Sequence, residues 1–257
     1  MAQPYYMLHF SAGCCMFQIR INDVPVMTLN LPGQAASVAP VNFAILKSGK
    51  QSIKATMLPH PGELSLNPAA FLEFELKLYD TQREFVFKEQ LLQQKFPAVD
   101  QAKPIPAERY QNEFSATVPY DLQGWENGRP LKDVEDVGIK LRAAHERIGK
   151  MISRKDYDGF KKLIAAREHI MCTSMYLDQG QANARVGGLI EDFESGFEMA
   201  PLAADAIVHL CGGGKTAALK KPNGEPALYL LNEQTREELM LDLMFYVPAG
   251  KTEFEVI

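Results

Sequence analysis

Apolar and polar side chains alternate along most of the first half of the chain, a pattern typical of strands with one buried face. Apolar residues occupy every second position from Phe17 to Ile21, and the pair Asn22-Asp23 that follows consists of residue types common in tight turns. A second apolar run, 24–29, comes directly after this pair. The pattern predicts a β-hairpin.

The clearest strand covers 72–79, where Leu and Phe side chains point to one face and charged or polar side chains to the other. Shorter extended runs occur at 53–58, 85–87 and 114–120, separated by Pro, Gly and Asn. Several short strands with such punctuation are typical of an antiparallel sandwich of the immunoglobulin or jelly-roll kind. We expect an all-β domain over residues 1–127.

Two segments of this half, FQIRINDVPV at 17–26 and ILKSGKQSIKATMLP at 45–59, follow each other as a strand, a turn, a strand and a later strand after a long link. This order resembles the jelly-roll modules of galactose-binding-like proteins. The resemblance implies a fold and does not imply a sugar site.

The hydrophobic period changes after 124–130, a segment rich in turn formers that contains Trp125, the only tryptophan of the chain. Apolar residues then recur every three or four positions, which predicts three helices, over about 134–151, from about 156, and over 182–197. Strand patterns return at 206–210, 216–220, 227–231, 239–247 and 253–257. Three helices followed by an antiparallel sheet predict an α+β domain over 131–257.

The order of these elements and the stretch RKDYDGFKKLIA at 154–165 resemble the cone-shaped fold of the nuclear-transport-factor-like superfamily. Enzymes of that superfamily often place an Asp or His in the mouth of the cone as a general base. The resemblance implies a ligand pocket reached by a set of polar residues, namely Tyr157, Asp158, His169, Asp205 and His209.

Charge is unevenly distributed in the second half of a chain whose formal net charge is −5. Segment 140–167 has a net charge of +6, and segment 168–205 has a net charge of −6. Either neighbouring helices neutralise each other, or one face docks an oppositely charged partner. The docking hypothesis names nine residues: Lys140, Arg147, Lys150, Arg154, Lys161, Lys162, Glu191, Asp192 and Glu194.

No complete catalytic or metal motif is present in the sequence. The string 212–216, Gly-Gly-Gly-Lys-Thr, ends like a phosphate-binding loop, but position 209 holds His209 instead of the required glycine, so we expect a hairpin turn. His169 and Cys172 share a helix face and His145 could approach them, yet no second half of a metal site is visible. The spacing of the four cysteines predicts no disulfide framework.

These features favour a non-enzymatic protein that binds another protein or a second copy of itself, of the bacterial inhibitor or immunity type, and they leave catalysis open. The alternatives are a small-molecule or catalytic pocket in the second domain and a carbohydrate-binding sandwich using Tyr5, Tyr6, Tyr79 and Tyr120. We expect no cofactor, no nucleic acid and no membrane span, because apolar runs fall well short of about 20 residues. The N-terminus has no basic region before an apolar run, so we expect a cytoplasmic location.

Overall fold

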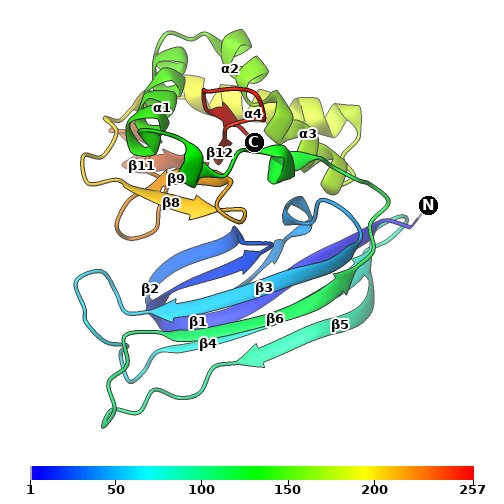
Figure 1. Cartoon of the computed structure of the whole chain (residues 1–257), viewed down its shortest axis with the longest axis vertical. Helices are drawn as coiled ribbons and strands as arrows, with labels where there is room; N and C mark the ends of the chain where they lie inside the picture. The colour runs from blue at the N-terminus through cyan, green and yellow to red at the C-terminus, as the bar shows by residue number, and fades with distance from the viewer. Residues whose placement is uncertain (1) are drawn as a thin grey trace. The chain divides into compact units, whose positions relative to one another are not determined.

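The computed structural model describes residues 2–257, and the chain forms two compact units, Met1–Leu122 and Gln123–Ile257. The first unit is built of antiparallel strands, and the second contains four α-helices followed by antiparallel sheets (Figure 1). The predicted fold class, all-β and then α+β, is therefore confirmed.

Six strands form the sheet of the first unit in the order β5-β4-β1-β3-β6, with β2 paired to β1. They are β1 (Pro4–Ile21), β2 (Val24–Pro40), β3 (Gly49–Leu58), β4 (Phe71–Asp80), β5 (Val86–Lys95) and β6 (Glu108–Ala116). A short 3₁₀-helix, η1 (Asn42–Ala44), follows β2. The long strand β1 pairs with β4 along its first half and with β3 along its second half.

The two halves of β1 meet at a β-bulge, where the register with β2 shifts between Gly13 and Cys15 and Cys14 lies opposite two residues of β2, Pro32 and Gly33. Cys14 has a φ of +51°, in the left-handed region, and the buried positions of β1 change from even to odd numbers across it. The alternating buried positions are Tyr6, Leu8, Phe10 and Ala12 before the bulge and Cys15, Phe17, Ile19 and Ile21 after it, and Met7 and Gly13 are buried as well. The bulge thus lets both halves bury their apolar side chains.

The predicted hairpin is confirmed, because Ile21 pairs with Val24 across the turn Asn22-Asp23, whose φ angles are +51° and +62°. Positive φ at both central residues is the requirement of the type I′ turn. The sheet has two arms, β4 with β5 on one side of β1 and β3 with β6 on the other. These arms face each other, since the ring centroids of Phe74 in β4 and Tyr110 in β6 lie 5.8 Å apart. This contact places the core of the first unit between the arms, as in a sandwich.

The second unit opens with two 3₁₀-helices, η2 (Gly124–Asn127) and η3 (Leu131–Asp133). The α-helices are α1 (Val137–Ser153), α2 (Tyr157–Leu163), α3 (Ala165–Ser174) and α4 (Gln179–Glu194). The second predicted helix is thus two short helices that meet at Ile164. Asp156 caps α2 by accepting a hydrogen bond from Gly159 N, and Asp178 forms a capping box with Gln181 at the start of α4.

The strands of the second unit form two sheets, β11-β10-β7 and β13-β12-β9-β8. Their bounds are β7 (Glu198–Met199), β8 (Ile207–Cys211), β9 (Thr216–Lys220), β10 (Tyr229–Asn232), β11 (Glu237–Met240), β12 (Phe245–Tyr246) and β13 (Glu255–Val256). The predicted strand 239–247 is divided, because 241–244 leave one sheet before β12 enters the other. Leu141, Ile148 and Phe160 from the helices pack with Phe245 and Phe254 in one core.

Candidate functional site

Basic side chains form a stripe along the outer face of α1. Lys140, Arg147 and Arg154 recur every seven residues, and Lys150 follows Arg147 by three, so these four share one side of the helix. We call them the basic stripe. Arg147, Lys150 and Arg154 are exposed and Lys140 is half-buried, whereas the opposite face of α1 is in the core.

None of the stripe residues forms an ion pair with another residue of 2–257, and the same is true of Lys161 and Lys162 on α2. Arg147 Nη2 donates a hydrogen bond to the carbonyl oxygen of Phe254, at 3.2 Å, which fixes the side chain without neutralising it. The positive charge of this face therefore remains available to a partner.

A groove of about 480 Å³ runs beside the stripe, between α1, α2, the start of α3 and the C-terminal strand β13. Its apolar lining comprises Met151, Leu163, Ala166, Phe254 and Val256, with Gly159 between them. Its charged lining comprises Arg147, Lys162, Glu253 and Glu255, of which Glu255 is paired with Lys251 at 2.5 Å. The groove thus combines an apolar floor with basic residues on its helical side and acidic residues on the side of the C-terminal segment.

The acidic residues of the docking hypothesis, Glu191, Asp192 and Glu194, are exposed on α4. Phe193 between them is buried and contacts the ring of Phe160 on α2 with centroids 5.4 Å apart. None of the three acidic residues forms an ion pair in the part of the chain that is described. The nine predicted docking residues are therefore exposed or half-buried, and all lie on α1, α2 or α4 except Arg154, the C-cap of α1.

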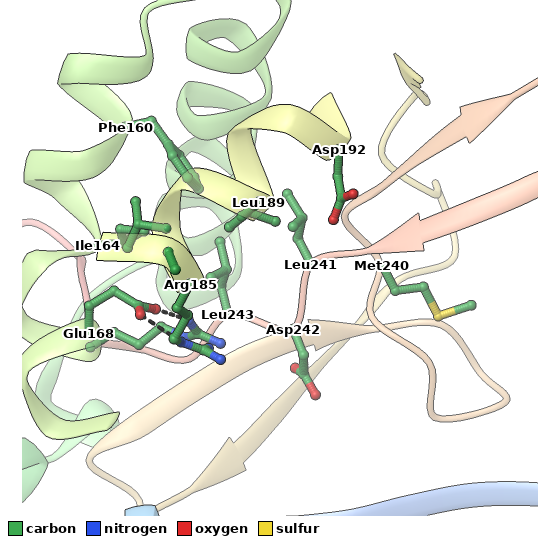
Figure 2. Close-up of a pocket in the computed structure, with 14 residues that line it drawn as sticks. Phe160, Ile164, Glu168, Arg185, Leu189, Asp192, Met240, Leu241, Asp242 and Leu243 are labelled. Carbon is green, nitrogen blue, oxygen red and sulfur yellow. Dashed lines mark hydrogen bonds and ion pairs between the residues drawn. The ribbon is translucent and has the colours of Figure 1, made fainter. Parts of the chain in front are cut away.

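A second pocket, of about 470 Å³, lies between α2, α3, α4 and the segment 240–243 (Figure 2). At one side of it, the buried Glu168 pairs with Arg167 and with Arg185 Nε, the latter at 2.8 Å from Glu168 Oε2. This site could not be predicted from the sequence, because Glu168 and Arg185 lie on different helices and neither belongs to a motif. The one signal was an acidic residue at a core-facing helical position.

The five residues of the predicted ligand pocket are distributed over separate places. Tyr157 is half-buried against Phe193, with ring centroids 6.3 Å apart, while Asp158, His169 and Asp205 are exposed. His209 is half-buried on β8. None of the five lines either of the two pockets described above, and their role in ligand binding stays a prediction.

His145 lies on the core face of α1, where its side chain is 1% exposed. Nδ1 donates to the carbonyl oxygen of Leu141, at 2.9 Å, and the ring packs on Phe245 with centroids 4.4 Å apart. Burial lowers the pKa of His145 to about 4, so the imidazole is neutral at neutral pH. Within residues 2–257 no three His, Cys, Asp or Glu side chains gather as metal ligands.

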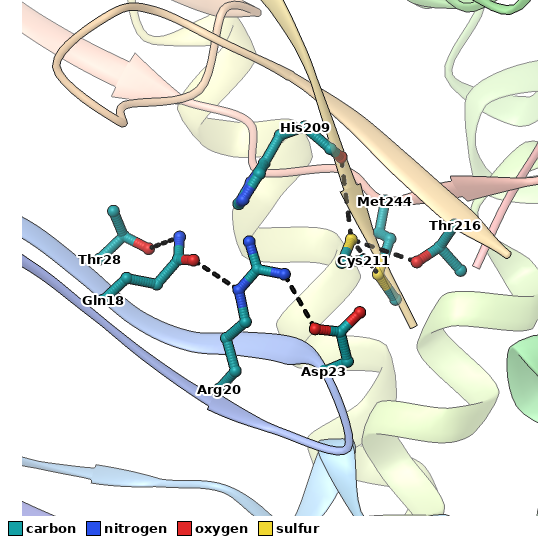
Figure 3. A network of polar contacts seen from close by, with 8 residues as sticks. All are labelled: Gln18, Arg20, Asp23, Thr28, His209, Cys211, Thr216 and Met244. Carbon is teal, nitrogen blue, oxygen red and sulfur yellow. Dashed lines mark hydrogen bonds and ion pairs between the residues drawn. The ribbon is translucent and has the colours of Figure 1, made fainter. Parts of the chain in front are cut away.

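The string 212–216 forms the predicted hairpin turn, since Cys211 of β8 pairs with Thr216 of β9. The three glycines have φ values of +58°, +65° and +76°, a left-handed path that favours glycine. At its end Thr216 Oγ1 donates to Cys211 Sγ, at 3.2 Å (Figure 3). The three glycines are therefore explained by the left-handed backbone conformation of the turn.

All four cysteines are free of disulfides, with Cys15 and Cys211 buried. Burial raises the pKa of Cys15 to about 11, which keeps this thiol protonated. Within the first unit, Arg20 on β1 pairs with Asp23 in the turn at 3.0 Å, and its Nε donates to Gln18 Oε1 on the same strand at 2.5 Å (Figure 3). Gln18 Nε2 in turn donates to Thr28 Oγ1 on β2, at 2.9 Å. These contacts support the hairpin structurally.

Of the four tyrosines considered for carbohydrate binding, Tyr5 and Tyr79 contact the same ring, that of Phe85, and Tyr6 is buried. Tyr6 is 1% exposed, and its hydroxyl donates to the carbonyl oxygen of Thr117. Tyr79 is stacked on Phe85, with centroids 4.5 Å apart, and Phe85 contacts Tyr5 edge-on. Phe85 and Phe87, which pack on Tyr79, are exposed, and carbohydrate binding by this unit stays a prediction.

Comparisons of the chain with protein-family models, curated proteins and solved structures gave no match. No helix within residues 2–257 has the length and apolar character needed to cross a membrane.

Proposed function

We propose that this is a non-enzymatic binding protein that holds an acidic protein partner through the basic stripe and the neighbouring groove of its second unit. The observation that carries the proposal is the row Lys140, Arg147, Lys150 and Arg154, without ion-pair partners among the described residues. Such unneutralised charge raises the association rate with an oppositely charged surface and sets its orientation.

The groove adds an apolar contact surface to the charge of the basic stripe. Exposed ion pairs contribute only about 0.2 to 1 kcal/mol each, so a stable complex also needs an apolar anchor. Met151 and Leu163, both half-buried, offer an apolar surface for one large side chain of the partner. The proposed partner segment therefore carries several acidic residues around one apolar side chain.

Comparative affinity capture from native lysate tests the proposal. The wild-type protein is compared with Lys150→Glu/Arg154→Glu, and the matched control is Lys103→Glu/Lys132→Glu, which makes the same charge change at two other exposed lysines. We expect wild type and control to retain one protein in stoichiometric amount and the stripe variant to retain at least tenfold less, a loss of about 1.4 kcal/mol.

Retention should also decrease as the salt concentration rises from about 0.05 to 0.5 M, because exposed charge pairs are screened. A stoichiometric partner that the stripe variant retains fully would contradict the proposal. Nucleic acid as the only species whose retention depends on the stripe would contradict it as well.

We include three further points in this proposal: an inhibitor or immunity-type role, a cytoplasmic location, and the finer fold resemblances of the two units. An inhibitor needs a surface complementary to its target and no reaction centre of its own, which suits a charged helical face. The jelly-roll and nuclear-transport-factor-like resemblances concern the fold of each unit and are independent of the proposed docking surface.

A further inference from the structure

The pocket between α2, α3, α4 and segment 240–243 contains a pair of arginines held by one acid. Glu168 has an 11% exposed side chain, and each of its carboxylate oxygens is occupied, Oε1 by Arg167 and Oε2 by Arg185. Two guanidinium groups on one carboxylate leave a net positive charge at this side of the pocket. Figure 2 shows Glu168 and Arg185 together beside the apolar residues Ile164 and Leu243.

Each guanidinium group has N–H donors to spare. Arg185 uses Nε for Glu168, and its Nη1 and Nη2 make no hydrogen bond to another residue in the described part of the chain. Arg167 likewise uses only Nη1. A planar fork of N–H groups, fixed in place by a buried acid, is the arrangement that receives a carboxylate in two parallel hydrogen bonds.

The other charged residues of the pocket limit what can bind. Asp242 is paired with the Lys220 ammonium group, with both carboxylate oxygens at 2.7 Å, so its charge is neutralised. Asp192 lies on the opposite side of the pocket from Glu168 in Figure 2 and forms no ion pair within 2–257. A second negative charge at the far end of a ligand would therefore be repelled.

The rest of the lining is apolar. Phe160, Ile164, Val186, Leu189 and Leu243 surround the space between the charged ends, and its volume of about 470 Å³ lies in the range of small-molecule pockets. We propose that this pocket binds a small apolar monocarboxylate, whose carboxyl group is received by Arg167 and Arg185 and whose hydrocarbon part lies against Ile164, Val186 and Leu189.

Two neighbouring glycines of α4 allow a matched test. Gly188 lines the pocket, and a Cβ atom added to it has no heavy atom within 4 Å, so a large side chain there would enter the open space. Gly187 is equally open but does not line the pocket. Gly188→Phe should fill the pocket without disturbing the fold, and Gly187→Phe is its control.

Isothermal titration calorimetry on the full chain tests the proposal. The ligands are octanoate and its uncharged counterpart, octanamide. We expect octanoate to bind wild type and Gly187→Phe equally, and to bind Gly188→Phe and Arg185→Met at least tenfold more weakly. Octanamide should bind wild type at least tenfold more weakly than octanoate. Octanedioate should also bind weakly and should recover affinity in Asp192→Asn.

The proposal is overturned if octanoate does not bind the wild-type protein, if octanamide binds as tightly as octanoate, or if Gly188→Phe binds octanoate as tightly as Gly187→Phe. Thermal unfolding of each variant verifies that it is folded, and the Gly188→Phe comparison stays decisive even if Arg185→Met is unstable. These measurements are independent of the basic stripe, so the docking proposal can fail while this one holds.

Discussion

The ammonium group of Lys220 lies 2.7 Å from both carboxylate oxygens of Asp242, although the lysine side chain is 7% exposed and the aspartate side chain 62% exposed. The two ends of this pair thus differ in their access to water. Removing the exposed partner leaves a buried charge, whereas removing the buried partner leaves a hydrated one.

This asymmetry predicts unequal effects of two substitutions. Asp242→Asn should reduce the free energy of unfolding by about 1 to 3 kcal/mol, because the Lys220 ammonium group loses its counter-charge. Lys220→Met keeps the buried apolar stem and should cost less than about 1 kcal/mol. Urea unfolding followed by the fluorescence of Trp125, a buried residue of the second unit, measures both. Equal costs for the two variants would contradict the prediction.

The buried His145 predicts a pH-dependent stability of the second unit. Burial lowers its folded-state pKa from 6.5 to about 4, so between these values the unfolded chain takes up a proton and the folded chain does not. The contribution of this group is complete above pH 6.5 and is lost as the pH falls toward 4, by about 3 kcal/mol at most.

His145→Gln removes this titration while an amide N–H can still donate to Leu141. We expect its stability to change less than that of wild type between pH 6.5 and 4, measured by urea unfolding at several pH values. Carboxylate titrations are common to both proteins and cancel in the comparison. Parallel pH profiles would show that His145 does not carry this effect.

The glycine turn between β8 and β9 provides a matched pair of positions. A Cβ atom at Gly212 would lie 2.8 Å from Thr216 Oγ1 and 2.9 Å from Trp125 Cδ1, whereas at Gly213 it would meet nothing within 4 Å. Both glycines have positive φ, so alanine at either costs about 1 to 2 kcal/mol of backbone strain.

Gly212→Ala should therefore destabilise the second unit by at least about 1 kcal/mol more than Gly213→Ala, since overpacking adds to the backbone strain. It should also shift the fluorescence emission of Trp125. Thermal unfolding and emission spectra of the two variants decide the matter, and an equal loss in both would mean that the Trp125 contact tolerates the added methyl group.

The left-handed backbone conformation of Cys14 predicts opposite effects of two substitutions at this position. Cys14 has a φ of +51°, where glycine is unstrained and a β-branched residue is strongly disfavoured. Cys14→Gly should leave the stability of the first unit unchanged or raise it by up to about 1 kcal/mol, and Cys14→Val should lower it by about 1 to 2 kcal/mol. Calorimetric unfolding measures both, and a more stable valine variant would contradict the role of this conformation.

Strand and helix patterns were sufficient for the fold class. Regular alternation identified the β1–β2 turn at Asn22-Asp23, and the three-to-four spacing identified α1, because each element buries one face. The alternation of apolar and polar residues did not predict the strand where its backbone departs from regular extended geometry. The extension of β1 back to Pro4 was missed, since the bulge at Cys14 interrupts the alternation.

The start of α1 was predicted a few residues too early. Val134 is buried at the end of η3 and fits the helical spacing, but α1 begins at Val137, after Asp136 with a φ of +54°. Asp133 therefore lies in a 3₁₀-helix and does not cap α1. Hydrophobic spacing alone does not distinguish a 3₁₀ turn from the first turn of an α-helix.

The candidate sites were only partly accessible from the sequence. The basic stripe follows from spacing within one helix, which a linear pattern contains. The Arg167–Glu168–Arg185 cluster depends on the packing of α4 against α3, and the groove depends on the return of β13 to α1. Contacts between distant segments of this kind require the tertiary structure.

Photo-crosslinking from the groove tests the docking account most directly. A benzoylphenylalanine placed at Met151 lies in the groove, and the same residue at Leu64, which is 92% exposed in the first unit, serves as control. The account predicts that the protein captured by wild type crosslinks at position 151 and not at 64, and that Lys150→Glu/Arg154→Glu abolishes the crosslink. Crosslinking at 64 alone, or at 151 regardless of the charge reversal, would contradict it.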